Sequence, residues 1–166
     1  MSTENTVRVS LRLRKDVHDT VIAVANDAGI DPAAFMQNAI AISVEDHLPE
    51  ATREELRRME RFIQIAQNEA RALFAEGGFT EHFTLSVFDR LMANHETRSL
   101  YEDIIGVDAL TDGAPGKTPL NMYLGWYIKN AVGAEPLLDE AGKAKRAFVK
   151  GKPIKSYTLL SPPAEA

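Results

Sequence analysis

Residues 7–14, VRVSLRLR, alternate apolar and polar side chains. Because successive side chains of a β-strand point to opposite faces, this alternation predicts a strand with one apolar and one basic face. The apolar face comprises Val7, Val9, Leu11 and Leu13. The opposite face comprises Arg8, Ser10, Arg12 and Arg14. Helical patterns follow instead of a second strand, and an isolated strand is marginal in water, so we expect it to pair with its copy in a second chain.

Two helices are predicted directly after this strand. Residues 16–28 repeat apolar side chains at three- and four-residue steps, and Gly29 supplies a stop. Asp31 and Pro32 then suit the N-cap and first position of a second helix, which ends before Pro49. The apolar positions of the first helix are Val17, Val21, Val24, Ala25 and Ala28. Those of the second are Phe35, Met36, Ala39, Ile40, Ile42 and Ser43.

This order of strand, helix, Gly turn and helix within residues 7–48 resembles the ribbon-helix-helix (MetJ/Arc-like) family of DNA-binding proteins. The resemblance implies a homodimer that inserts a two-stranded antiparallel β-ribbon into the major groove, with Val7, Val9, Leu11 and Leu13 in the dimer core. It assigns base contacts to Arg8, Ser10 and Arg12. It assigns phosphate contacts to Arg14, Lys15, Ala33 and Ala34. Asp31 departs from the family pattern, which usually has Ser or Thr there.

The charge pattern favours the same interpretation. Residues 7–15 carry four basic side chains and no acidic one, within a chain whose formal net charge is −5. Contacts to DNA must therefore come from a local basic surface rather than from the whole protein. The alternative is an edge strand of an ordinary sheet whose arginines are merely solvated.

A long charged helix is predicted over residues 51–76. A heptad-like seam could extend the dimer as a short coiled coil, and it comprises Leu56, Met59, Ile63, Ala66, Ala70 and Leu73. However, Phe62, Ile65 and Phe74 widen the apolar stripe, which favours packing on a globular core. We therefore expect a connecting helix that packs on the C-terminal domain.

The region beyond Gly77 and Gly78 predicts a second domain. Helices are expected over residues 84–93, 96–105 and 119–132, and short strands over 145–150 and 154–160. The runs LNMYLGWYIKNAVGAE and IKSYTLL resemble winged-helix domains of phage and plasmid proteins. The fold class is thus expected to be mainly α with short β. The expected divisions are a tail over 1–6, ribbon-helix-helix over 7–48, connecting helix over 50–77, winged-helix-like domain over 79–160 and tail over 161–166.

The end of this domain is strongly basic, with six basic residues and no acid over residues 141–164. Such a hairpin, or wing, could lie along DNA phosphates, or its lysines could simply keep an exposed edge soluble. The domain could instead mediate oligomerisation or hold a protein partner. Candidate residues for a second DNA contact are Asn121, Lys129, Lys143, Lys145, Arg146, Lys150, Lys152 and Lys155.

Composition limits other chemistry. The 166-residue chain has no cysteine, which excludes disulfides, thiolate nucleophiles and cysteine-ligated metals. Its histidines have no metal-ligand spacing, so no metal, cofactor or catalytic site is expected. The GKT at residues 116–118 lacks the earlier glycine and buried strand of a phosphate-binding loop. No apolar run is long enough to span a membrane and no signal peptide is evident, which predicts a cytoplasmic protein. The family resemblances imply a prokaryotic protein that joins the nucleoid when bound.

The sequence thus predicts a dimeric, sequence-specific DNA-binding protein rather than an enzyme, most simply a transcriptional repressor of a palindromic or repeated operator. One alternative is a plasmid partition or conjugation accessory protein that organises an assembly on DNA. Another is an antitoxin-like protein whose C-terminal domain binds a protein partner. Antitoxin tails are generally short and disordered, whereas the periodicity beyond Gly78 predicts a folded domain, which disfavours this last alternative.

Overall fold

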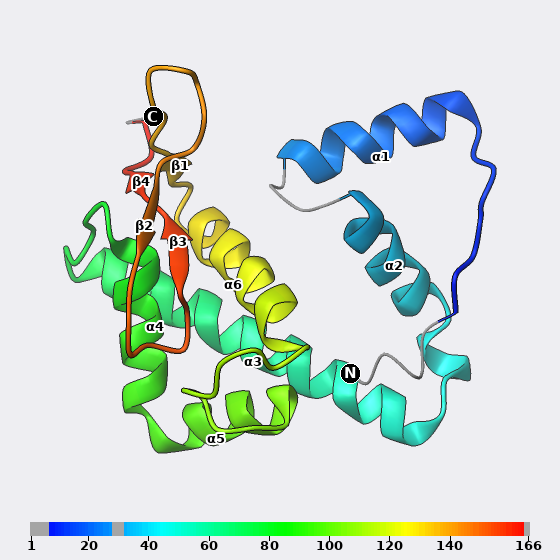
Figure 1. Cartoon of the computed structure of the whole chain (residues 1–166), viewed down its shortest axis with the longest axis horizontal. Coiled ribbons are helices and arrows are strands. Elements are labelled where there is room, and N and C mark those ends of the chain that lie inside the picture. The colour runs from blue at the N-terminus through cyan, green and yellow to red at the C-terminus, as the bar shows by residue number, and fades with distance from the viewer. Residues whose placement is uncertain (1–6, 28–31, 165–166) are drawn as a thin grey trace. The chain divides into compact units, whose positions relative to one another are not determined.

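The computed structural model describes residues 7–27 and 32–164, and the chain divides into an N-terminal unit, Met1–Leu56, and a C-terminal unit, Arg57–Ala166 (Figure 1). The helices are α1 (Lys15–Asp27), α2 (Pro32–Ser43), the short 3-10 helix η2 (Glu45–His47), α3 (Glu50–Ala75), α4 (Phe83–Ala93), α5 (His95–Ile105) and α6 (Lys117–Ala131). The strands are β1 (Glu135–Pro136), β2 (Arg146–Phe148), β3 (Ser156–Thr158) and β4 (Leu160–Ser161). Among the described residues the protein is therefore mainly helical.

The predicted fold class is wrong at the N-terminus, because residues 7–14 form no strand and hence no ribbon. A strand needs a neighbouring strand to satisfy its backbone groups, and the described strands all lie between residues 135 and 161. The segment is instead an extended stretch without regular secondary structure that leads into α1 (Figure 1). Its last carbonyl, that of Arg14, accepts a hydrogen bond from the backbone N–H of His18 at 2.9 Å, in the first turn of the helix.

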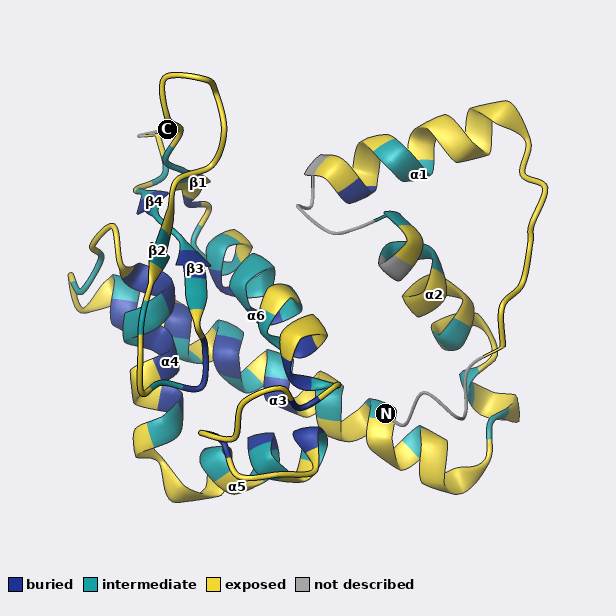
Figure 2. Ribbon diagram, viewed as in Figure 1, coloured by how far each residue is buried: buried dark blue, intermediate teal, exposed yellow. Residues whose placement is uncertain are grey.

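In the N-terminal unit, α1 packs on α2 but the pair encloses almost no core. Helix α2 begins at Pro32, as predicted, and ends at Ser43, several residues before the predicted end. Ala25 is the one fully buried side chain among the described residues of this unit (Figure 2). The large apolar side chains left exposed on α1, α2 and the turn after it are Val17, Val24, Ile40, Ile42 and Val44. These helices therefore keep an uncovered apolar surface.

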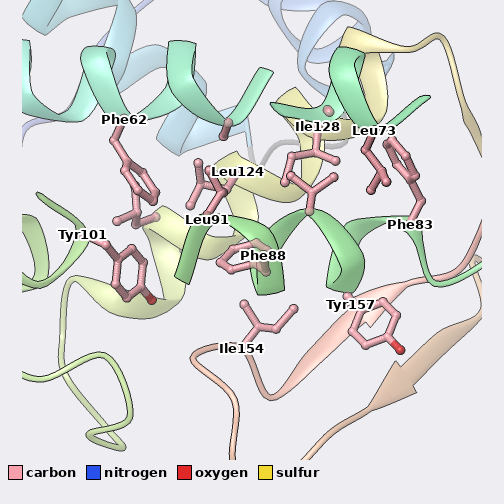
Figure 3. Close-up of a cluster of buried hydrophobic side chains, with 14 of the residues drawn as sticks. Phe62, Leu73, Phe83, Phe88, Leu91, Tyr101, Leu124, Ile128, Ile154 and Tyr157 are labelled. Carbon is pink, nitrogen blue, oxygen red and sulfur yellow. The ribbon is translucent and has the colours of Figure 1, made fainter. Parts of the chain in front are cut away.

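Helix α3 ends in the core of the C-terminal unit. Its side chains there are fully or almost fully buried, in contact with residues of the later helices (Figure 3). They are Phe62, Ala66, Ala70 and Leu73. The Phe62 ring lies 5.5 Å from that of Tyr101 in α5, centroid to centroid. From Phe62 onward α3 is therefore part of the core of the C-terminal unit.

The three predicted helices of the C-terminal unit are confirmed, with bounds that differ by one or two residues. Their ends follow local chemistry: the side chain of Asn94 accepts a hydrogen bond from the N–H of Thr97 at the start of α5. Gly106 ends that helix with a φ of +73°, a left-handed conformation that costs glycine little. The main buried residues that α4, α5 and α6 contribute are Phe83, Val87, Phe88, Leu91, Tyr101, Ile105, Leu120, Leu124 and Ile128.

The β structure of the described residues consists of two separate two-stranded antiparallel sheets, β1–β4 and β2–β3, rather than one winged-helix hairpin. In the second sheet Arg146 is opposite Thr158, Ala147 opposite Tyr157 and Phe148 opposite Ser156. Leu159, between β3 and β4, donates its N–H to Lys145 and accepts from Leu137, so it joins the two sheets. The buried side chains of Ile154 and Tyr157 pack against the helical core (Figure 3). The buried side chain of Leu160 belongs to the same core.

We expect Phe62→Ala to destabilise the C-terminal unit strongly. Removing a fully buried Phe ring costs about 3–5 kcal/mol, because packing is lost and a cavity remains. The melting temperature should fall by roughly 10–30 °C for a unit of this size. Thermal unfolding followed by circular dichroism measures the change, and Phe148→Ala, at an exposed ring of the same unit, is the matched control that should leave it unaltered.

Candidate nucleic-acid interface

The N-terminal segment (residues 7–14) is exposed along its whole length. The exposed fraction of its apolar side chains falls from 86% at Val7 to 42% at Leu13, so the predicted dimer core, which also includes Val9 and Leu11, is uncovered in the single chain. On the polar positions, no side-chain hydrogen bond or ion pair joins Arg8, Ser10 or Arg12 to any described residue. The predicted base-contacting side chains are therefore available for a ligand.

The predicted phosphate contacts Arg14 and Lys15 are already paired with acids of α1. The guanidinium of Arg14 donates from Nε (3.2 Å) and Nη2 (2.7 Å) to the two carboxylate oxygens of Asp16. Lys15 Nζ lies 2.5 Å from Asp19 Oδ2, and His18 Nδ1 lies 3.1 Å from the other oxygen. These hydrogen bonds, that from Lys15 first, lower the pKa of Asp19 below its usual value. A phosphate would have to compete with these carboxylates, so Arg8 and Arg12 are the more available cations.

The predicted phosphate contact at the start of the second helix is described only in part. Asp31 lies outside the described residues, and α2 begins at Pro32 with Ala33 exposed and Ala34 within its first turn. The first turn of α2 contains no acidic residue. Phosphate binding by the amides of Ala33 and Ala34 stays a prediction.

The basic C-terminal region divides into paired and unpaired cations. Lys152 Nζ lies 2.6 Å from Asp89 Oδ1 in α4, and Lys155 Nζ lies 3.3 Å from Asp112 Oδ1. Arg146 Nη2 donates to the hydroxyl of Ser156 at 2.7 Å. No ion pair with a described carboxylate involves the remaining exposed cations, which are Lys143, Lys145, Arg146 and Lys150.

Asn121 is engaged inside the C-terminal unit. Its Oδ1 accepts from the hydroxyl of Tyr101 at 2.9 Å, and its Nδ2 donates to the carbonyl of Pro153 at 3.2 Å. Burial raises the pKa of Tyr101 to about 12, so this phenol remains a donor at neutral pH. Asn121 thus joins α5, α6 and the β2–β3 turn. Lys129, the other candidate on α6, is half-buried near the end of that helix, and its DNA contact stays a prediction.

Lys117 of the GKT sequence is also engaged by the chain itself. Its ammonium donates to the carbonyls of Ala109 (2.6 Å) and Thr111 (2.7 Å), and burial lowers its pKa. This lysine holds the loop before α6 onto the start of the helix. These hydrogen bonds give Lys117 a structural role. They agree with the sequence-based argument against a phosphate-binding loop at residues 116–118.

Phe148 was not singled out from the sequence, and it is the most exposed large apolar side chain among the described residues of the C-terminal unit, at 83%. The sequence does contain a relevant indication, because Phe148 follows Arg146 by two residues in the run KRAFVK. In a strand that spacing places both side chains on one face. The Phe148 ring is thus on the same face of β2 as Arg146, which forms no ion pair with a described carboxylate.

Other kinds of site find no support in the described parts of the chain. No group of three His, Asp or Glu side chains there lies in a position to hold a metal ion. None of the helices in residues 7–27 and 32–164 has the length and apolar character to cross a membrane. Comparison with family models, curated proteins and solved structures finds no match.

Proposed function

We propose that the protein is a homodimeric, sequence-specific DNA-binding regulator, a transcriptional repressor that contacts its operator through the N-terminal segment. The observation that carries the proposal is that uncovered apolar side chains alternate along residues 7–14 with Arg8 and Arg12, which form no ion pair with a described residue. The apolar and the basic side chains of this segment suit different partners. The apolar side chains suit a second protein surface, and the arginines suit an anionic ligand.

The uncovered apolar surface supports a second copy of the chain as the protein partner. A unit whose described residues bury only Ala25 completely has too little core to be stable alone. The apolar side chains of the N-terminal segment and those of α1 and α2 are of the same chemical kind. Around a two-fold axis, the segment of each copy can cover the helices of the other, and both contacts form at once.

The availability of Arg8 and Arg12 supports DNA as the anionic ligand. If Val7, Val9 and Leu11 face the second copy in a drawn-out chain, the intervening Arg8, Ser10 and Arg12 face away from it. One arginine can donate hydrogen bonds to both O6 and N7 of a guanine, which reads the base. Contacts to phosphates alone carry no sequence information. The net charge of −5 opposes indiscriminate coating of DNA, so binding depends on this local cluster.

The experiment that tests the proposal is selection of duplex DNA by the purified chain at physiological salt. We expect sequencing of the retained fragments to reveal one enriched motif made of two symmetric half-sites, because two identical copies bind. Sedimentation equilibrium of the free protein should give the mass of a dimer. Retained fragments without any enriched motif, or a monomeric protein on its motif, would contradict the proposal. The genomic positions of the fragments, upstream of genes or elsewhere, test the repressor role.

A further inference from the structure

Phe148 lies on an exposed face of the β2–β3 hairpin that the proposed operator contact does not use. We propose that this face is a second binding site, for single-stranded nucleic acid, in which a base stacks on the Phe148 ring. The site involves residues of the C-terminal unit alone and is independent of the N-terminal segment.

The register of the hairpin defines the two faces. Ala147 and Tyr157 are opposite each other and point to the core, where Tyr157 is 7% exposed. The neighbouring pairs point the other way, and we call them the outer hairpin face, which consists of Arg146, Phe148, Ser156 and Thr158. Arg146 donates to Ser156, the residue opposite Phe148, so its guanidinium lies beside the Phe148 position.

The cations on and beside the outer hairpin face favour an anionic occupant. Lys145 and Lys150 are exposed at either side of Arg146 and Phe148 along the chain, and neither forms an ion pair with a described carboxylate. No acidic residue occurs between residues 141 and 164. A ring that offers a stacking surface among cations matches the combination by which proteins bind single strands, with bases on aromatic rings and phosphates on lysines and arginines.

The anchoring of the hairpin turn favours a single strand over the groove of a duplex. Lys152 is bridged to Asp89, the Pro153 carbonyl accepts from Asn121, and Ile154 is 3% exposed. The turn is therefore held against the helices and cannot project as a finger into a groove. In a duplex the faces of the bases are covered by stacking, whereas in a single strand they can reach a ring that lies on a surface.

The test measures binding of a fluorescein-labelled 12-nucleotide oligothymidine to the full chain by fluorescence anisotropy. We expect Phe148→Ala to weaken binding by about 5- to 150-fold, which corresponds to the loss of one stacked base. Phe148→Trp should retain binding because it keeps an aromatic face. Phe148→Leu should lose it, although it keeps an apolar side chain. Leu110→Ala, at an exposed apolar residue between Asp108 and Asp112, is the control that should change nothing.

Further measurements distinguish this site from the operator contact, from duplex binding and from binding to a membrane surface. The Phe148→Ala loss should persist when Arg8 and Arg12 are also replaced by alanine, so failure of the operator proposal leaves this one testable. Equal losses on a 12-base-pair duplex of unrelated sequence would overturn the choice of a single strand. Binding to vesicles of phosphatidylcholine and phosphatidylserine that Phe148→Leu preserves would overturn it in favour of a membrane surface. Unchanged oligothymidine binding in Phe148→Ala, or no binding by the original chain, would overturn the site altogether.

Discussion

Replacing Arg8 and Arg12 together by alanine is expected to abolish selective binding to the operator while the protein remains a folded dimer. Each good bidentate contact between arginine and guanine contributes about 1–3 kcal/mol of discrimination. Two arginines in each of two copies make four such contacts, or about 4–12 kcal/mol. Specific binding exceeds non-specific binding by a similar margin, about 4–10 kcal/mol. The double substitution therefore removes most or all of the selectivity.

Competition binding between the operator and unrelated duplex measures this effect. The matched control is Arg14→Ala with Lys15→Ala, which removes the same number of charges from side chains already paired with Asp16 and Asp19. The control should weaken binding to both duplexes alike and lower the log–log salt slope by no more than about 0.9 for each phosphate that is no longer neutralised. Operator protection that survives in Arg8→Ala/Arg12→Ala would remove the N-terminal segment from the proposed function.

The helices of the C-terminal unit could be predicted because the information for them is local. The apolar spacing of residues 84–93 and the glycine after Ile105 are sufficient to place α4 and the end of α5 to within a residue. The burial of Phe62 followed from the width of the apolar stripe on α3. These features depend on side chains within one or two helical turns of each other, which the sequence displays directly.

The strand prediction at residues 7–14 was wrong for the opposite reason. Alternation indicates which side chains could share a face of a strand. A strand forms only against another strand, however, and no described strand lies near residues 7–14 in the sequence. The candidate interface shows the same limit. The pairing of Lys15 with Asp19 is readable from their spacing of four, whereas that of Lys152 with Asp89 spans 63 positions. The packing of Asn121 against Tyr101 and Pro153 is likewise non-local, and it gives a predicted DNA-contacting residue a structural role.

Val9→Ser combined with Leu11→Ser is expected to dissociate the dimer and, with it, operator binding. In the single chain these side chains are 70% and 59% exposed, so their loss should cost an isolated monomer almost nothing. If they are buried against a second copy, each contributes about 1.5–3 kcal/mol, and four of them contribute about 6–12 kcal/mol to the dimer. Even a dimer with a dissociation constant of 1 nM, which corresponds to about 12 kcal/mol, would lose at least about half of its binding free energy. The variant should therefore be monomeric at micromolar concentration.

Sedimentation equilibrium distinguishes the two cases, and the chain provides a close control. Val107→Ser with Leu110→Ser makes the same two chemical changes at exposed positions of the loop before α6, and it should leave the dimer intact. Circular dichroism adds a second readout, because α1 and α2 enclose almost no core of their own. Their helical signal should weaken in Val9→Ser/Leu11→Ser, while the melting transition of the C-terminal unit stays in place, since its core lies in α3 to α6 and the strands. A variant that remains a dimer with full helicity would mean that some other surface joins the copies, and Arg8 and Arg12 would then lack the two-fold arrangement on which a symmetric operator depends.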